Sequence, residues 1–135
     1  MNDGGHPYRV AAVPPPGRKP VLIDPRIVRP LNQSMWQSNC SRCDKRQSKW
    51  EVLHDGKQVI LCSVCLLYDT PWGTKNTVQI EELIAETEKE SGTKFPRTAE
   101  GRLTIDRADQ LMAAIAMTSR LFAAQDRMKR MRGEN

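Results

Sequence analysis

The chain has few of the residues that build a large hydrophobic core. Aromatic residues make up 5% of its 135 positions and hydrophobic residues 39%. No run approaches the roughly 20 apolar residues of a membrane-spanning helix, so we expect no membrane segment. The N-terminus lacks the continuous apolar stretch of a secretory signal. These absences predict a protein that is not secreted but intracellular (cytoplasmic, nuclear or inside an assembled particle). They also predict a small core that needs a further source of stability.

Residues typical of catalysis are also scarce. The chain has two histidines, His6 in a proline-rich segment and His54 at the expected tip of a hairpin. It has no nucleophile motif and no glycine-rich loop of the kind that cradles phosphate. We therefore predict that the protein is not an enzyme, with no catalytic residues and no small-molecule substrate.

The positive charge is spread along the chain rather than concentrated. The formal net charge is +5, with +3 in residues 1–38, +2 in 39–76, −2 in 77–105 and +2 in 106–135. A dedicated nucleic-acid-binding protein often has a denser basic patch. The charge therefore permits a polyanionic partner without requiring one.

All four cysteines fall within 26 positions, as two CxxC pairs: Cys40 and Cys43, then Cys62 and Cys65. Two residues between cysteines let both sulfurs turn toward one ion, and the interval between the pairs lets the second pair complete a tetrahedron. Four thiolates suit zinc and close its coordination shell. We therefore predict one structural Zn²⁺ bound by these four cysteines. Disulfides, or an iron–sulfur or iron centre, are the alternatives.

The interval between the pairs predicts a β-hairpin, because Asp55-Gly56 favours a type I′ turn. A turn centred there gives two cross-strand apolar pairs on one face: Trp50 with Leu61, and Val52 with Val59. A short helix opening at Ser63 and ending near Thr70, before Pro71, would carry the second cysteine pair in its first turn. Knuckle, hairpin and short helix make residues 39–76 a treble-clef zinc finger. A zinc ribbon, with both pairs on hairpin knuckles, is the alternative.

The remaining segments complete a small α+β fold. Residues 1–38 hold seven of the nine prolines and predict an extended proline-rich N-terminal arm, with a disordered leader as the alternative. Apolar stretches of this arm could lie on a partner or on the zinc unit. Residues 77–92 predict a short helix that stops at Gly92, and residues 93–105 a connector. Residues 106–132 lack internal glycine and proline and predict a long amphipathic C-terminal α-helix.

One broad side of that long helix is apolar, and its candidate interaction residues are Leu111, Ile115, Leu121, Phe122 and Met128. Asp109, Arg120 and Arg127 lie on the opposite, polar side. A helix of this length exceeds what a finger-sized neighbour can cover, so we expect a protein partner or a second copy to cover part of it. The alternative is that it folds back onto residues 77–92 and the finger.

Residues 40–68 contain a motif of cysteines, a tryptophan, an Asp-Gly turn and apolar residues at defined positions. Its members are Cys40, Cys43, Trp50, Asp55, Gly56, Leu61, Cys62, Cys65, Leu67 and Tyr68. This arrangement resembles a GATA-type zinc finger, and the resemblance implies a treble-clef fold, zinc and DNA binding. Glu51 and Val52 stand where that family has basic residues, and Ser63 and Leu66 where it has asparagine and glycine.

Two functions are compatible with these features. The first is a non-enzymatic, zinc-stabilised binding module that acts as an assembly or adaptor subunit through its arm and C-terminal helix. The second is a nucleic-acid-binding zinc-finger protein of transcription or a ribonucleoprotein. Its candidate contacts are Arg42, Lys45, Arg46, Lys49 and Lys57. We favour assembly, because acidic and apolar residues replace basic ones in the finger.

Overall fold

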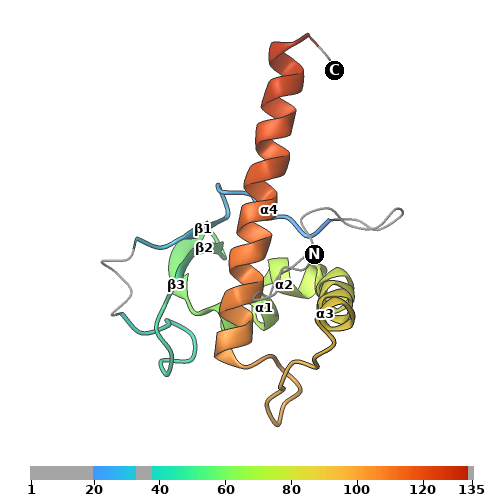
Figure 1. Cartoon of the computed structure of the whole chain (residues 1–135). Coiled ribbons are helices and arrows are strands. Elements are labelled where there is room, and N and C mark those ends of the chain that lie inside the picture. The colour runs from blue at the N-terminus through green and yellow to red at the C-terminus, as the bar shows by residue number, and fades with distance from the viewer. Residues whose placement is uncertain (1–19, 33–37, 134–135) are drawn as a thin grey trace.

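The computed structural model describes residues 20–32 and 38–133, so residues 1–19 and 33–37 of the predicted arm, and residues 134–135, lie outside the described residues. The described residues form a small α+β fold with a three-stranded antiparallel sheet, short helices and a long C-terminal helix (Figure 1). The strands are β1 (Val28–Pro30), β2 (Trp50–His54) and β3 (Lys57–Leu61). The helices are α1 (Ser63–Tyr68), α2 (Pro71–Lys75), α3 (Thr77–Ser91) and α4 (Ile105–Met131).

The predicted hairpin and its register are confirmed: β2 and β3 pair antiparallel in the register that the turn imposes. Asp55 and Gly56 both have positive φ, at 52° and 78°. A type I′ turn requires this at both central residues. The register places Trp50, Val52 and Leu61 in the core.

The described part of the proline-rich segment belongs to the fold. β1 pairs antiparallel with β2, with Val28 opposite Val52. Four side chains of the segment are buried: Val21, Ile23, Val28 and Leu31. The Trp72 indole N–H donates to the carbonyl of Leu22 at 3.0 Å. The apolar stretches of this segment therefore lie on the cysteine-containing unit, which is one of the two places expected for them.

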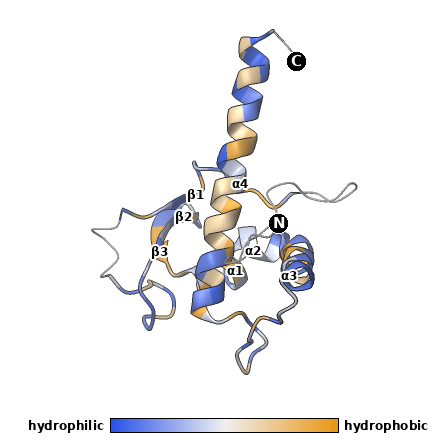
Figure 2. Cartoon of the chain, in the orientation of Figure 1, coloured by the Kyte–Doolittle hydropathy of each residue, from blue (hydrophilic) through white to orange (hydrophobic). Residues whose placement is uncertain are grey.

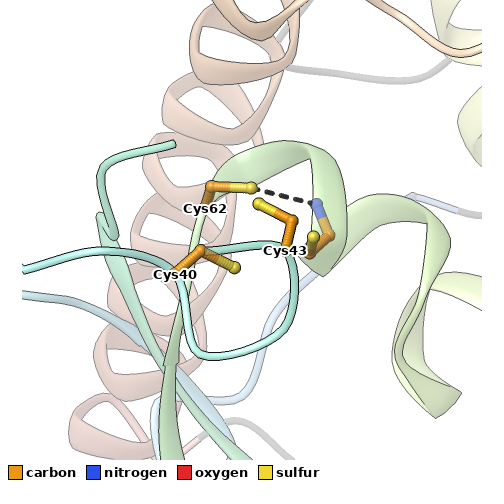
Figure 3. A group of neighbouring side chains, drawn as sticks. Cys40, Cys43 and Cys62 are labelled. Carbon is orange, nitrogen blue, oxygen red and sulfur yellow. Dashed lines mark hydrogen bonds between the residues drawn. The ribbon is translucent and has the colours of Figure 1, made fainter. Parts of the chain in front are cut away.

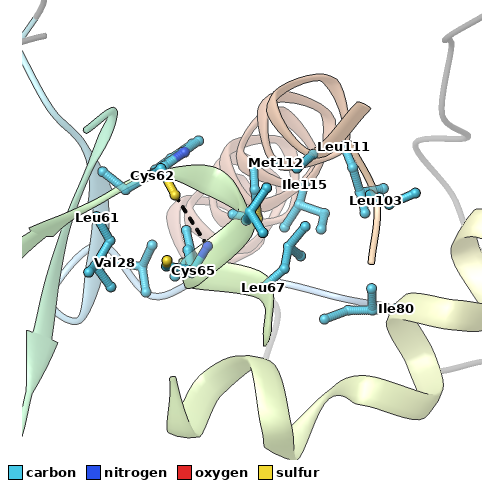
Figure 4. Packing of buried hydrophobic residues seen from close by; sticks show 14 of the residues in the cluster. Val28, Leu61, Cys62, Cys65, Leu67, Ile80, Leu103, Leu111, Met112 and Ile115 are labelled. Carbon is cyan, nitrogen blue, oxygen red and sulfur yellow. Dashed lines mark hydrogen bonds between the residues drawn. The ribbon is translucent and has the colours of Figure 1, made fainter. Parts of the chain in front are cut away.

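Helix α1 lies at the centre of the core. Five of its residues are buried: Ser63, Val64, Cys65, Leu66 and Leu67. The helix contacts α2, α4 and β2. Figure 4 shows Val28 and Leu61 on one side of α1, and Met112 and Ile115 of α4 on the other. The helix that carries the second cysteine pair is therefore held between the sheet and α4.

Helix α2 was not predicted. Thr70 caps it, because its side chain accepts a hydrogen bond from the Gly73 N–H at 3.0 Å while donating to the Leu66 carbonyl at 2.7 Å. Pro71 takes the first helical position, where no N–H is needed. At Gly73 a Cβ would lie 2.0 Å from the carbonyl oxygen of Leu67, so α2 packs on α1 at a distance that glycine alone allows.

Helix α3 lies where a helix over residues 77–92 was predicted, and it ends at Gly92 in the left-handed conformation with φ 72°. Its inner side chains Ile80 and Ile84 join the core, together with Phe95 and Leu103 from the connector. The connector therefore closes the core from the side of α3.

Helix α4 consists of an anchored half and a projecting half. The buried residues belong to the anchored half: Ala108, Leu111, Met112, Ile115, Ala116 and Thr118. From Ser119 to Gly133, residues are half-buried or exposed, and Figure 1 shows this part extending beyond the rest of the described residues. None of the described helices is both long enough and apolar enough to cross a membrane.

Candidate metal centre

The two CxxC pairs meet where the loop before β2 approaches the start of α1. Cys62 is the N-cap of α1 and Cys65 lies in its first turn. The four Sγ atoms all lie within 4.8 Å of one another, and Figure 3 shows the sulfurs of Cys40, Cys43 and Cys62 turned toward one another. Thiolates around one tetrahedral zinc would sit about 3.8 Å apart, given Zn–S bonds of about 2.3 Å. The group therefore fits a metal ion.

The peptide backbone supports negative charge on these sulfurs. Backbone N–H groups donate to three of them: Arg42 to Cys40 at 3.4 Å, Lys45 to Cys43 at 3.5 Å, and Cys65 to Cys62 at 3.4 Å, the last drawn dashed in Figure 3. Such donors orient the sulfurs and stabilise the thiolate form. Three of the four cysteines are buried, so water has little access to the group.

Arg46 adds a side-chain donor to two of the cysteines. Its Nη1 lies 3.4 Å from the Sγ of Cys43 and 3.8 Å from the Sγ of Cys62. Burial disfavours the charge of Arg46, but its hydrogen bonds and charge interactions with these two cysteines outweigh burial and raise its pKa above the ordinary value. Arg46 is therefore part of the cysteine site.

The pKa values of the thiols differ with their surroundings. Burial raises the pKa of Cys62 and of Cys65. Burial acts in the same direction at Cys43, but backbone hydrogen bonds from Lys45 and Arg46 outweigh it and lower the pKa to about 6. A thiol that coordinates a metal ion is deprotonated by it. A bound cation would therefore let the two buried thiols ionise beside Cys43.

A second group of charges joins α1 to the connector. Both terminal nitrogens of Arg102 donate to the carboxylate of Asp69, at 2.9 and 2.8 Å, and its guanidinium lies 5.2 Å from the ring centre of Tyr68. The Nε of Arg42 lies 3.5 Å from the same carboxylate. Burial opposes ionisation of Asp69, but these two guanidinium groups hold its pKa below the usual range. Asp69 is therefore an anion at neutral pH.

A chain of hydrogen bonds links the cysteine site to α4. The Trp50 indole N–H donates to Ser63 Oγ at 2.8 Å, and Ser63 donates to Asp109 Oδ1 at 2.6 Å. Lys49 Nζ donates to Asp109 Oδ2 at 3.0 Å. Ser63 directly follows Cys62 and is fully buried. This link could not be predicted from the sequence, because Asp109 lies 46 residues from Ser63 and helical periodicity placed it on a polar side.

Three of the five basic residues expected to contact nucleic acid have partners inside this protein. Arg42 approaches Asp69, Arg46 the cysteine sulfurs and Lys49 the carboxylate of Asp109. Lys45 and Lys57 are exposed, and among the described residues no ion pair involves them. Of the five candidate contacts, Lys45 and Lys57 are therefore the two whose charges remain available to a partner.

The candidate interaction residues of the long helix fall into two groups, which corrects their assignment to one surface. Leu111 and Ile115 are each 1% exposed and belong to the core of this chain. Phe122 is half-buried. Leu121 and Met128 are 46% and 54% exposed. The apolar residues of the anchored half pack into the core of this chain. Those that remain exposed to a partner, Leu121 and Met128, lie in the projecting half.

Comparisons with protein-family models, with curated proteins and with solved structures found no match for this chain. The likeness of residues 40–68 to a GATA-type finger therefore remains a likeness of motif. The structure itself contributes a group of four cysteines that fits a metal ion.

Proposed function

We propose that this protein is a non-enzymatic, zinc-stabilised binding module that acts as an assembly or adaptor subunit and binds a protein partner through α4. The observation that carries the proposal is the projecting half of α4, with its preceding turn. Large apolar side chains are exposed there: Met117 at 55%, Leu121 at 46%, Met128 at 54% and Met131 at 85%. Contiguous apolar residues on a surface mark interaction sites more often than scattered ones do.

Zinc is the ion that this ligand set suits best, because four cysteine thiolates in tetrahedral reach of one another are typical of structural zinc sites. When bound, zinc would supply folding free energy, since four protein ligands leave no coordination position for water or substrate. Cys40, Cys43, Cys62 and Cys65 would hold the ion. Arg46 would orient the sulfurs of two of them.

The treble clef is the zinc-finger class that we propose for residues 39–76. In a zinc ribbon both cysteine pairs lie on hairpin knuckles, whereas here the second pair lies at the start of helix α1. A hairpin separates that helix from the first pair. This order of elements supports the treble clef.

The anchored half of α4 explains why a small core would carry so long a helix. Docking of this half against α1 fixes the direction of the projecting half before any partner binds. A surface that is ordered in advance loses less conformational entropy on binding. The cysteine-centred core therefore serves as the base from which α4 presents its apolar residues.

Nucleic-acid binding is the second candidate function. It is supported by Lys45 and Lys57 on the finger, and by Arg127, Lys129 and Arg130, which are exposed near the end of α4. It is weakened because Arg42, Arg46 and Lys49 are held by groups of this chain.

Site-specific photo-crosslinking in the native source separates the two functions. A photoreactive residue at Leu121 or Met128 should give crosslinks to protein that persist after nuclease treatment. The same residue at exposed Lys57 is the matched control and should give few crosslinks. Nuclease-sensitive crosslinks from Lys57, with none from the two helix positions, would contradict assembly through α4 and favour nucleic-acid binding.

A further inference from the structure

The four large exposed apolar residues of α4, together with half-buried Ala124, follow a heptad pattern. Met117, Leu121, Ala124, Met128 and Met131 are separated by four, three, four and three residues. This is the spacing of the a and d positions that meet in a coiled coil. At 100° per residue these five residues, which we call the α4 seam, lie opposite the buried residues of the anchored half. Figure 2 shows hydrophobic and hydrophilic residues alternating along this part of the helix.

Positive charge flanks the α4 seam. Arg120 and Arg127 directly precede Leu121 and Met128, at the g positions of the heptads. Both arginines are exposed, and within residues 20–32 and 38–133 no ion pair involves either of them. The carboxylate of Asp126 is paired with Arg130, one turn away. The flank of the seam therefore offers two guanidinium groups to a partner.

The same two arginines also line a groove beside the seam. This groove, about 360 Å³ in volume, lies between α4 and the segment that contains β1. Its apolar lining includes Ile23, Val28 and Ala123. An acidic side chain reaching either arginine would lie close to apolar surface on both sides. Such surroundings exclude part of the water and strengthen an ion pair.

A second copy of this chain fits the seam poorly. In a parallel coiled coil, a g position faces the e position of the next heptad in the other helix. Those e positions hold Gln125 and, just past the end of α4, Arg132, so a parallel second copy would offer no carboxylate to Arg120 or Arg127. In an antiparallel pair the g positions face each other, so arginine would meet arginine. Like charges at these positions oppose pairing and set the choice of partner.

We propose that the α4 seam binds an acidic amphipathic helix of a different protein. That helix has apolar residues at its own a and d positions and glutamate or aspartate at the flanking positions, where they pair with Arg120 and Arg127. This inference rests on the proposed assembly function and specifies the chemistry of the partner.

Two synthetic helical peptides of three heptads test the inference. Both have leucine at the a and d positions, and the flanking e and g positions are glutamate in one and lysine in the other. Each is titrated into the intact, zinc-loaded protein by calorimetry. The acidic peptide should bind at least about tenfold more tightly than the basic one, because each flanking arginine attracts one peptide and repels the other.

Variants of α4 assign the effect to the seam. The double change Arg120→Glu and Arg127→Glu should weaken binding of the acidic peptide about tenfold and reverse the preference. The change Leu121→Asp should abolish binding of both peptides. Lys129→Glu is the matched control, since it makes the same charge change on the same helix away from the seam, and it should keep the preference. Circular dichroism checks that each variant keeps its helix content.

Several outcomes would overturn the inference. Equal binding of the two peptides, or binding of neither, would refute the acidic partner. Sedimentation of the wild type as a dimer that Leu121→Asp dissociates would show that a second copy occupies the seam. An RNA or DNA oligonucleotide that binds through Arg120 and Arg127, without peptide binding, would assign these arginines to phosphate. Protein crosslinks from Leu121 without a preference for the acidic peptide would refute this partner chemistry while leaving the assembly function intact.

Discussion

Replacing Ser63 with alanine removes the hydroxyl that joins β2, α1 and α4. The Trp50 indole N–H, in a side chain that is 6% exposed, loses its acceptor at 2.8 Å. A buried donor left without a partner costs about 1–3 kcal/mol. Asp109 loses a donor at 2.6 Å, but it keeps Lys49 and is 23% exposed, so water replaces part of that bond. We therefore expect Ser63→Ala to lower the free energy of unfolding by about 2 kcal/mol.

Urea unfolding followed by tryptophan fluorescence measures this loss, at a fixed excess of zinc because bound metal shifts the apparent stability. Ser41→Ala is the matched control: it makes the same change at an exposed serine beside Cys40 rather than Cys62. We expect it to change the free energy of unfolding by less than about 0.5 kcal/mol.

A double-mutant cycle with Asp109→Ala tests whether the hydrogen-bond chain acts as a unit. The effects of Ser63→Ala and Asp109→Ala should fall short of additivity by about 1 kcal/mol, because either change alone breaks the shared bond. If Ser63→Ala costs no more than Ser41→Ala, or the two effects simply add, the link between the cysteine site and α4 does not contribute to stability as described.

Three further predictions concern packing and metal retention. Gly73→Ala should destabilise the fold by about 2 kcal/mol in urea unfolding, because its Cβ would lie 2.0 Å from the backbone of α1. This loss should exceed the small gain that alanine brings to a helix. A neutral or stabilising effect would contradict the close approach of α2 to α1. Arg46→Ala should weaken zinc retention against a competing chelator about tenfold, whereas Lys45→Ala should leave it unchanged; equal effects would refute the role of the Arg46 side chain. Leu111→Ala should cost about 2–5 kcal/mol of unfolding free energy and Leu121→Ala less than about 0.5; comparable losses would contradict the division of α4.

The features that the sequence predicts well depend on local chemistry. Asp55-Gly56 specifies a turn in which both residues need positive φ, and the turn alone sets which residues of β2 and β3 face each other. The cysteine pairs behave similarly, since two intervening residues suffice to turn both sulfurs one way. Gly92 ended α3 where its freedom to adopt a left-handed conformation indicated.

Features that depend on distant partners were not predictable. β1 has three residues and lies in a proline-rich segment, and its strand character comes from pairing with β2. Residues so rich in proline favour extended structure without indicating where it docks. Helix α2 illustrates a different difficulty, because Thr70-Pro71 ends one helix and begins the next. Proline disfavours helix in the residue before it and favours the first position of a new one.

The side on which α4 packs against the core was the feature hardest to predict from the sequence. Apolar residues cover so much of its circumference that periodicity assigned the buried side of the anchored half and the exposed seam of the projecting half to one broad apolar side. Ala108 and Ala116 are buried and mark the inner side of the helix in the structure. Asp109, predicted to lie on the polar side opposite the apolar one, accepts the hydrogen bond of buried Ser63. Which side docks was decided by this packing and this bond, and neither is visible in a single sequence.

The measurement that tests the central claim most directly is titration of the reduced, metal-free protein with cobalt(II), a spectroscopic substitute for zinc. A site of four thiolates should bind one ion per chain and give the intense sulfur-to-metal and ligand-field absorption of a tetrahedral complex, which one equivalent of zinc should displace. Helix content should rise as the ion binds, because metal binding and folding are coupled. Absence of these bands, together with full helix content in strong chelator, would contradict a fold built around a metal ion on Cys40, Cys43, Cys62 and Cys65.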